Sequence, residues 1–369
     1  MNYNTHKEIL QQPRVWRETY DVILSRKDEI KAFVDKYMDE GYQVVLTGAG
    51  SSAYIGDALE CALETTRFRG ARSIATTDIL TNPRIYFNSS SKVLLISFAR
   101  SGDSPESTGA VKAVENTAGS VAHIFITCNA EGALAKMEGS NILTILLPPE
   151  TNDLSLAMTS SCTSMLLACS MVSRINEIAE DKAYIDILSD RIAAAIEKYE
   201  GSLKEIAEKK FSRAVFLGSG SLKGIAEESR LKLQELSDGI IMCAFDSFMG
   251  FRHGPKAVIN KDTLIVYLVS PNPEVRRYEL DLMRTIRKQG RYCACVTVCH
   301  QIPEDCPESE LLVETNFPKA FPAVYGCVSF LFVAQLLGYY KSIALGLSPD
   351  APSADGNISR VVEGVTLYI

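Results

Sequence analysis

The segment 44–52 reads VVLTGAGSS, and the segment 214–221 reads AVFLGSGS. Each begins with an apolar run of strand length, passes through a Gly-x-Gly turn and enters a stretch with helical periodicity. Apolar runs bounded in this way are typical of strands buried in a parallel sheet, where a helix returns the chain to the next strand. The two segments therefore predict the first strand–turn–helix unit of an α/β domain, and they predict it twice.

Further strand-like segments follow each of these units in a similar order. In the first copy they are 73–80, 92–99, 123–128 and 142–147, and in the second copy they are 263–269 and 292–298. Helical patterns are expected from Trp16 to Tyr37, over 222–236, and as two long helices between 159 and 201. We expect an α/β fold of two tandem domains, each a largely parallel sheet flanked by helices in a flavodoxin-like or Rossmann-like three-layer sandwich. The expected domains are 1–205, with an N-terminal helix, and 206–369, with a C-terminal tail.

Length and charge limit the classes of function. A chain of 369 residues exceeds what one hydrophobic core usually serves, which agrees with two domains. The net charge is −7, and acidic and basic residues are mixed along the chain. A nucleic-acid partner is not expected, because binding it normally needs a basic face. A phosphorylated ligand must then be held by local groups.

No targeting or membrane segment is expected. Residues 1–12 are polar, and the longest apolar stretch, 321–347, is interrupted by Gln335, Gly338 and Lys341. This stretch is predicted to be a buried helix. The ten cysteines of a chain without a signal peptide indicate reduced thiols and a cytoplasmic protein. The cysteines near His300 could suggest a metal, but they form no CxxC pair, so buried thiols are favoured.

Two turns of the first copy are suited to an anion. One is 50–52, and the other is RSGDSPES at 100–107, directly after a predicted strand. In a parallel sheet both turns lie at the carboxyl ends of strands, where helix N-termini offer free N–H groups. Ser104 and Ser107 could instead form a simple helix start, but two equivalent turns favour a phosphate site. A dinucleotide site is disfavoured because the third glycine and the distal acidic residue are missing.

Three further motifs accompany these turns: KLQEL at 232–236, HGP at 253–255 and NISR at 357–360. With these motifs the chain resembles the SIS (sugar isomerase) family, and within it the isomerase half of glucosamine-6-phosphate synthase. LAMTSS at 156–161 and SADGN at 353–357 are most similar to the AgaS branch of galactosamine-6-phosphate deaminase/isomerases, also labelled tagatose-6-phosphate ketose/aldose isomerases. The resemblance implies isomerising deamination of galactosamine 6-phosphate to tagatose 6-phosphate and ammonium. It implies no cofactor and no metal.

The resemblance also implies roles for individual residues. Glu235 takes the place of the catalytic base, His253 that of the ring-opening residue, and Lys232 and Arg360 belong to the catalytic set. The residues implied in phosphate or substrate binding are Gly50, Ser51, Ser52, Arg100, Ser101, Ser104, Thr159 and Ser160. The chain departs from the synthase pattern at Ala99, Arg100 and Arg360, where serine, glutamine and lysine are expected. Arginine and lysine are not equivalent, so the role of Arg360 stays open.

The chemistry of these residue types fits an aldose–ketose conversion. A carboxylate on one face of carbons 1 and 2 can move the proton between them, and an imidazole can assist ring opening near neutral pH. Lys232, one helical turn before Glu235, could stabilise the developing negative charge. On pattern alone, Glu235 could be a solvated helix glutamate and His253 a capping residue.

Two alternatives use the same site. A phosphosugar isomerase of the tagatose-6-phosphate or glucosamine-6-phosphate type would need the same residues without deamination. A sugar-phosphate-binding regulator would not need Glu235 and His253 together. We expect a homodimer or a dimer of dimers, since SIS chains often complete a site with the histidine loop of a neighbouring subunit.

Overall fold

The computed structural model describes residues 3–361 and 364–368. The chain divides into two compact units, each discontinuous in sequence. The first-sheet unit holds Arg14–Asp153, Met158–Asp186 and the tail from Ser359. The second-sheet unit holds the residues up to Pro13, Leu154–Ala157 and Ile187–Ile358. This division differs from the expected one, which assigned the whole N-terminal helix to the first domain and the tail to the second. The expected boundary between residues 205 and 206 stays a prediction.

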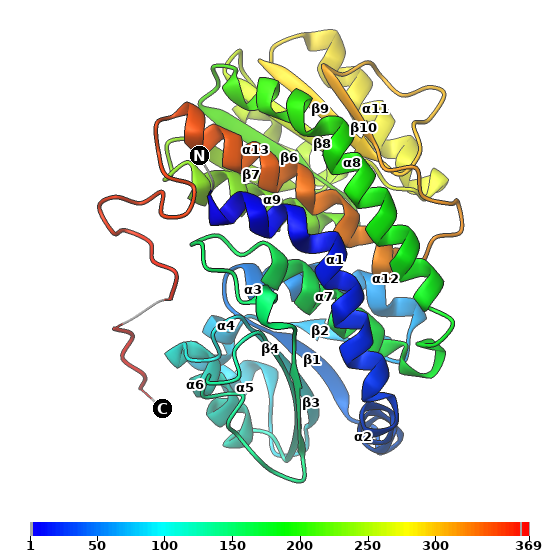
Figure 1. Cartoon of the computed structure of the whole chain (residues 1–369), viewed down its shortest axis with the longest axis vertical. Coiled ribbons are helices and arrows are strands. Elements are labelled where there is room, and N and C mark those ends of the chain that lie inside the picture. Colours follow the sequence, from blue (N-terminus) through cyan, green and yellow to red (C-terminus); the bar gives the residue numbers. More distant parts are fainter. Residues whose placement is uncertain (1–2, 362–363, 369) are drawn as a thin grey trace. The chain divides into compact units, whose positions relative to one another are not determined.

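The first-sheet unit contains a five-stranded parallel sheet in the order β2-β1-β3-β4-β5 (Figure 1). Its strands are β1 (Gln43–Thr47), β2 (Arg72–Ser73), β3 (Lys92–Ala99), β4 (Ser120–Thr127) and β5 (Ile142–Leu146). The central strand β3 is buried along seven of its eight residues, because helices cover both faces. This explains the continuous apolar run in its sequence.

Helices form the outer layers of this unit. They are α2 (Lys27–Asp39), α3 (Ser51–Ala62), α4 (Thr76–Thr81), α5 (Pro83–Tyr86), α6 (Pro105–Glu115) and α7 (Ser160–Ser173). Helices α4 and α6 share one apolar core with the sheet, and α3 and α7 pack on the strands from the other side (Figure 1). The helices α3 and α6 both begin at carboxyl ends of neighbouring strands, and this places their N-termini at one edge of the sheet.

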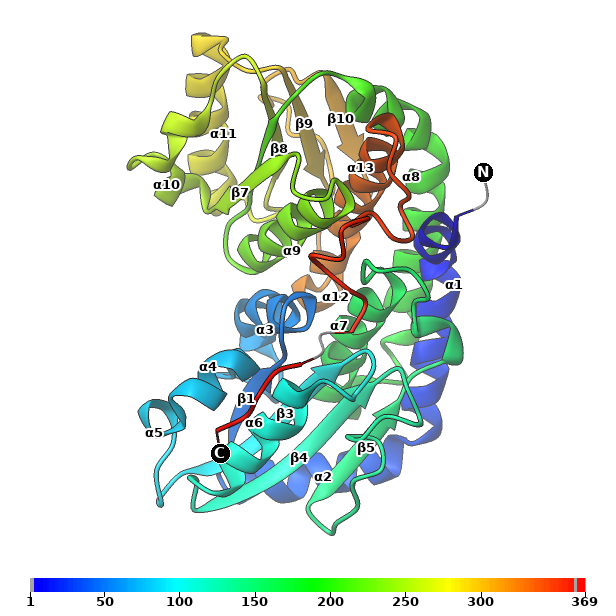
Figure 2. The ribbon, with the colours of Figure 1, turned by 90° about the vertical axis from the view of Figure 1, so that its left-hand side faces the viewer.

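The second-sheet unit repeats this topology. Its five parallel strands follow the order β7-β6-β8-β9-β10. They are β6 (Arg213–Leu217), β7 (Met242–Asp246), β8 (Thr263–Leu268), β9 (Ala294–Cys299) and β10 (Leu311–Glu314). Its helices include α9 (Ser221–Leu236), α10 (Phe248–Phe251), α11 (Pro273–Gln289), α12 (Ala323–Gly326) and α13 (Leu331–Ala344). Figure 2 shows α11 on one side of this sheet and α13 on the other, so the unit is a three-layer sandwich as predicted.

Three local predictions need correction. The segment 73–80 is not one strand, because β2 ends at Ser73 and α4 begins at Thr76. The first helical pattern is two helices, α1 (Asn4–Ser25) and α2, which are separated at Arg26 by a non-helical φ of −110° and ψ of 16°. Helix α1 also begins before Pro13 and contains it. The strands β7 and β10 were not expected, because both are short and only partly buried.

The long helix α8 (Lys182–Glu208) and α7 are the two helices expected between 159 and 201. The segment Ala323–Ala344 has the length and the apolar composition of a membrane span, yet 89% of its most apolar part is buried within the protein. It is therefore a core helix, as the interruptions of its apolar pattern indicate. Gln335 and Lys341 are buried there, and Lys341 donates to the backbone oxygens of Ala207 and Lys209 at 3.2 and 2.9 Å.

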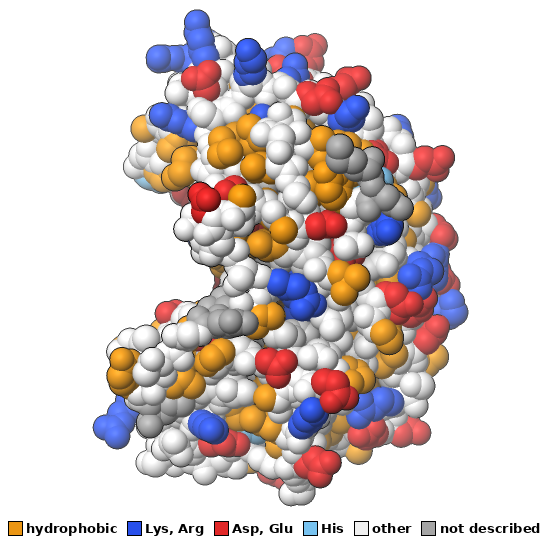
Figure 3. Space-filling model, turned by 60° about the vertical axis from the view of Figure 1, so that its left-hand side comes forward, with side chains coloured by type: hydrophobic (Ala, Val, Ile, Leu, Met, Phe, Trp, Pro, Cys, Tyr) orange, Lys and Arg blue, Asp and Glu red, His pale blue; other side chains and the backbone are white. Residues whose placement is uncertain are grey.

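Cysteines and surface charges fit this picture. All ten cysteines are free thiols, and Cys295 and Cys299 are buried in β9. Among the described residues, no group of three or more His, Cys, Asp or Glu side chains could hold a metal ion. Acidic and basic side chains are mixed over the face drawn in Figure 3.

Candidate active site

The turn between β1 and α3 depends on two glycines. Gly50 caps α3 with a φ of 56° and a ψ of −129°, a conformation that side-chain-bearing residues rarely adopt. A Cβ atom on Gly48 would lie 2.5 Å from the backbone carbon of Ser52. These glycines let the strand turn tightly into α3, whose first residues Ser51 and Ser52 are buried. The first N–H groups of this helix bond back to the turn, from Ser52 to the oxygen of Ala49 at 3.2 Å and from Ala53 to the oxygen of Gly50 at 2.9 Å.

The turn between β3 and α6 carries the second set of donors. Ser104 is the N-cap of α6, and its hydroxyl oxygen accepts a hydrogen bond of 3.3 Å from the backbone N–H of Ser107. Asn129, which follows β4, donates to the backbone oxygen of Ser101 at 2.9 Å. Gly132 approaches the same oxygen so closely that a Cβ there would lie 2.3 Å from it. The turn is thus fixed by the neighbouring loop.

The two turns meet at a pocket of about 120 Å³. Its lining includes five of the predicted residues, Ser52, Arg100, Ser101, Ser104 and Arg360, together with Glu106 and Met158. The predicted residues Gly50, Ser51, Thr159 and Ser160 do not line it. Thr159 and Ser160 are fully buried at the start of α7, where their backbone N–H groups bind Asp153. The pocket has the size of a small oxyanion and is bordered by two helix N-termini.

Two arginines give this pocket its positive charge. The side chain of Arg100 is largely buried, and its Nη2 donates to the backbone oxygen of Arg360 at 2.5 Å. The side chain of Arg360 donates from Nε to the backbone oxygen of Asp153 at 2.8 Å, and from Nη2 to the side-chain oxygen of Asn152 at 2.7 Å. These three bonds hold the tail segment from Ser359 against the first-sheet unit. Arg360 therefore lies among the residues predicted to bind phosphate, in the unit that does not contain Glu235.

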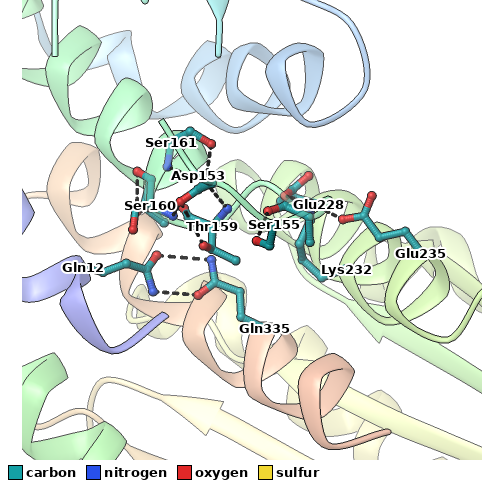
Figure 4. A network of polar contacts seen from close by, with 12 residues as sticks. Gln12, Asp153, Ser155, Thr159, Ser160, Ser161, Glu228, Lys232, Glu235 and Gln335 are labelled. Atoms are coloured by element: carbon teal, nitrogen blue, oxygen red, sulfur yellow. Dashed lines mark hydrogen bonds and ion pairs between the residues drawn. The ribbon is translucent and has the colours of Figure 1, made fainter. Parts of the chain in front are cut away.

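Asp153 organises the start of α7 behind this pocket. Its carboxylate accepts hydrogen bonds from the backbone N–H groups of Thr159, Ser160 and Ser161 at 2.8, 3.2 and 2.9 Å, and from the Ser161 hydroxyl at 2.6 Å (Figure 4). Burial raises the pKa of Asp153, and the bonds from Ser161 and Thr159 and the charge of Arg100 offset part of that rise. The same residue thus caps a helix and fixes Arg360 through its backbone.

The second-sheet unit carries a charged triplet on α9. Lys232 is fully buried and lies between two carboxylates, at 3.1 Å from Glu228 and in hydrogen-bond contact with Glu235 (Figure 4). The side chain of Glu228 is 3% exposed and that of Glu235 is 15% exposed. The spacing of four and three residues places all three on one helix face. Of the two carboxylates, Glu235 is the one that solvent can reach more easily.

His253 lies on the turn that follows α10. It is exposed, and its backbone N–H donates to the oxygen of Gly250 at 3.0 Å. The next residue, Gly254, has a φ of 145°, which is open to glycine and strained for other residues. The side chain of His253 can therefore be presented on the surface of a stiff turn. Lys232 and Glu235 lie on α9 of the same unit.

Three further residues escaped the sequence analysis. Asp153 precedes a Thr-Ser-Ser helix start by six residues, and an isolated aspartate before such a start is the available signal. Glu228 lies one turn before Lys232, so the spacing of the three charges could have indicated it. Glu106 is part of the second turn and lines the pocket, and its Oε2 is buried with no hydrogen-bond partner among the described residues.

Comparisons with known proteins agree with this arrangement. The model of the SIS domain family matches residues 36–173. The D-galactosamine-6-phosphate deaminase AgaS of Escherichia coli is 35% identical over 99% of this chain and 95% of its own length. The enzyme of the same name from Shewanella sp. (strain ANA-3) is 35% identical over 99% of this chain and 91% of its own length. The crystal structure of tagatose-6-phosphate ketose/aldose isomerase from Escherichia coli superposes with a TM-score of 0.91 and 33% identity, covering 100% of this chain and 97% of that one.

The similarity to the two deaminases and to the isomerase structure extends over nearly the whole chain, and therefore over both sheets. A relative of this identity that is matched along nearly its whole length shares both fold and family with the chain. The chain therefore belongs to the AgaS family of SIS-domain proteins.

Proposed function

We propose that this protein catalyses the isomerising deamination of D-galactosamine 6-phosphate to tagatose 6-phosphate and ammonium. The observation that carries the proposal is the α9 triplet, in which the reachable carboxylate Glu235 is paired with the fully buried Lys232. It is supported by the full-length similarity to D-galactosamine-6-phosphate deaminases. Such a pair can remove a proton next to a carbonyl carbon and balance the charge that develops.

The phosphate group is assigned to the pocket of the first-sheet unit. Ser52, Ser101 and Ser104 would donate hydroxyl protons, and the N-terminus of α6 would add backbone N–H groups. Arg100 and Arg360 supply positive charge to the same pocket. Phosphate binding there anchors one end of the open-chain sugar, which leaves its first two carbons for proton transfer.

The proposed reaction begins with opening of the sugar ring, for which His253 would exchange protons with the ring oxygen and the hydroxyl on carbon 1. Glu235 then takes the proton from carbon 2, and the electron pair of that C–H bond moves toward the carbonyl. Lys232 balances the negative charge of this enolate-like state. Return of the proton to carbon 1, together with transfer of one N–H proton to the oxygen on carbon 1, leaves a hydroxyl there and an imine on carbon 2. Water adds to the imine carbon, the C–N bond breaks, and ammonia leaves as ammonium.

We also propose that the chain works as a homodimer or a dimer of dimers, and that it works in the cytoplasm. His253 is exposed on its turn, so it is available to a neighbouring subunit. All ten cysteines are free thiols, which is typical of proteins from reducing compartments.

A plain aldose–ketose isomerase is the second candidate, because the superposed Escherichia coli structure carries the name tagatose-6-phosphate ketose/aldose isomerase. The test is a panel of galactosamine 6-phosphate, glucosamine 6-phosphate and galactose 6-phosphate, assayed for both ammonium and ketose. We expect ammonium and ketose in equal amounts from galactosamine 6-phosphate. Ketose formation from galactose 6-phosphate with no ammonium from either amino sugar would establish the isomerase instead. The Glu235→Gln variant serves as the inactive control for either reaction.

A further inference from the structure

The two sheets carry the same turn at the same place. Gly220, the N-cap of α9, has a φ of 59° and a ψ of −129°, and Gly50 has 56° and −129°. Gly218, like Gly48, leaves no room for a Cβ, which would lie 2.1 Å from the backbone oxygen of Leu222. The second turn therefore has the backbone geometry of the first. The first N–H groups of α9 also bond back to the turn as in α3, from Leu222 to the oxygen of Ser219 at 3.1 Å and from Lys223 to the oxygen of Gly220 at 3.0 Å.

The strand register extends this equivalence to the second pair of turns. In the first sheet Thr47 pairs with Ser97, and in the second sheet the matching residue Leu217 pairs with Tyr267. The same offset places Ser270 where the first copy has Arg100, one of the residues predicted to bind phosphate or substrate. The helices after these turns also begin alike, with Ser104 and Pro105 in α6 and Asn272 and Pro273 in α11, although the second turn is two residues shorter than the first.

In the second copy a carboxyl group of the chain itself already occupies this position. The backbone N–H of Ser270 donates to Oε2 of Glu279 at 2.8 Å. Glu279 is fully buried, and its Oε1 has no hydrogen-bond partner among the described residues. Burial raises the pKa of this carboxyl group, and the Ser270 N–H, the Ser219 hydroxyl and the charge of Arg276 offset only part of the rise. Ser219 belongs to the Gly-x-Gly turn, so both turns of the second copy face this carboxylate.

The first copy has no such group. When α6 and α11 are aligned at their caps, Glu279 takes the position of the buried apolar residue Val111. An apolar side chain fills this helix position without cost, whereas a buried carboxylate with an unpartnered oxygen is costly to the fold. The packing of α11 on the sheet therefore does not explain why a carboxylate stands at position 279. The need for an acceptor for the Ser270 N–H and the Ser219 hydroxyl does explain it.

We infer that the second sheet holds a duplicated oxyanion site whose ligand is the chain's own Glu279 carboxylate, and that removing this carboxylate opens the site to a phosphate-class anion. The chain then binds one phosphate, in the first-sheet pocket, because the second site is occupied from within. The opened site would be the weaker of the two. Leu222 and Pro271 stand where the first copy has Ser52 and Ser101, so two hydroxyl donors are lost, which corresponds to about 30-fold in Kd.

The test is titration of inorganic phosphate into the wild-type protein and into Glu279→Ala, with the number of sites per chain measured by isothermal calorimetry. Glu274→Ala is the matched control, because Glu274 is an exposed carboxylate in the first turn of the same helix. We expect one site in the wild type and in Glu274→Ala, and two in Glu279→Ala. Added formate should compete with phosphate only at the second site, because formate is a carboxylate of the same charge as the Glu279 side chain that the variant lacks.

The possible outcomes distinguish a failure of this inference from a failure of the proposed function. Only the assignment of the first site rests on the proposed function. No site in the wild type and one in Glu279→Ala would overturn the first-sheet assignment and support the second. Equal numbers of sites in both proteins would overturn the duplicated site and leave Glu279 as a structural tie to Ser270. If Glu279→Ala is too unstable, Glu279→Ser is titrated in its place. If folded Glu279→Ser has the same number of phosphate sites as the wild type, the duplicated site is likewise overturned.

Discussion

The guanidinium of Arg100 donates a hydrogen bond of 2.5 Å to the backbone oxygen of Arg360, although 260 positions separate the two residues along the chain. This bond joins the strand–turn–helix segment of the first pocket to the tail. The side chain of Arg360 continues the connection to Asn152 and Asp153. A pocket that begins as two local turns is thereby completed by the end of the chain, and both arginines depend on each other for their place.

Arg360 is expected to act at the phosphate end of the substrate. Replacing it with alanine removes two side-chain hydrogen bonds and one charge, so KM for the phosphorylated substrate should rise about 10- to 100-fold. Arg360→Lys should recover little of this loss, because one ammonium cannot replace the fork that reaches both Asn152 and Asp153. Steady-state kinetics checks this, with Ser359→Ala as the neighbouring control. A collapse of kcat at constant KM would show that Arg360 serves the chemical step.

Glu235 is expected to be the base. Glu235→Gln keeps the size of the side chain and removes the proton acceptor, so kcat should fall by about 10²- to 10⁴-fold while binding of the sugar phosphate persists. Glu227→Gln is the control on the same helix, because Glu227 pairs with Arg230 instead of Lys232. Turnover and calorimetric binding are measured on both. Near-normal turnover of folded Glu235→Gln would remove Glu235 from the mechanism.

Ser101 and Ser104 are expected to bind the phosphate group. Either alanine variant should weaken binding of phosphorylated substrate by about 1 kcal/mol or more, and neither should change binding of the unphosphorylated sugar. Ser104 also caps α6, so Ser104→Ala should in addition cost about 1 kcal/mol of stability.

Ser104→Asp separates the two roles of this residue. Aspartate restores the cap, yet it places a negative charge in the phosphate pocket, so stability should return while binding worsens. Denaturation midpoints measure the stability of each variant, and calorimetry measures its binding of the phosphorylated sugar. If all three serine variants bind phosphorylated and free sugars like the wild type, the phosphate lies elsewhere.

Asp153 is expected to control stability and its pH dependence. Because burial raises the pKa of Asp153, the folded protein holds this proton more tightly than the unfolded chain does. Stability should therefore decrease as the pH rises above the ordinary value of 3.8 and level off above the raised pKa.

Asp153→Asn should remove this pH dependence. It should also cost about 1–3 kcal/mol, because an amide NH₂ would face the N–H groups that Asp153 now accepts. Urea denaturation at several pH values tests both effects. Asp103→Asn is the exposed control. Identical pH profiles for the wild type and Asp153→Asn would contradict the assignment.

The proposed dimer predicts complementation between two inactive variants. If His253 completes the site of a neighbouring subunit, a mixed dimer of Glu235→Gln and His253→Ala has one site with both lesions and one with neither. Random mixing in equal amounts should restore about a quarter of the wild-type activity. Activity is measured after subunit exchange has been shown by mass spectrometry. Failure to complement would place His253 in the site of its own subunit, and a fully active monomer would exclude the dimer.

The sequence by itself determined the features that are local. The apolar run and the two glycines of 44–52, repeated at 214–221, identify the βα units, and strand β3 follows its predicted limits at Lys92 and Ala99. Such patterns can be read because burial on both faces and tight turns each restrict residue type over a few adjacent positions. The sequence did not predict the partly buried edge strands β7 and β10 or the helix break near Arg26. At these places the structure restricts residue type only weakly.

Only the tertiary structure decided which distant groups meet. Nothing near Arg360 in the chain specifies that it reaches Asn152 and Asp153, or that its backbone accepts from Arg100. The partnership of Ser270 with Glu279 likewise became visible only when α11 was packed beside its turn. Contacts of this kind arise from the geometry of packed elements, and a buried donor or acceptor takes whichever partner that packing brings near. Local periodicity carries no information on that choice.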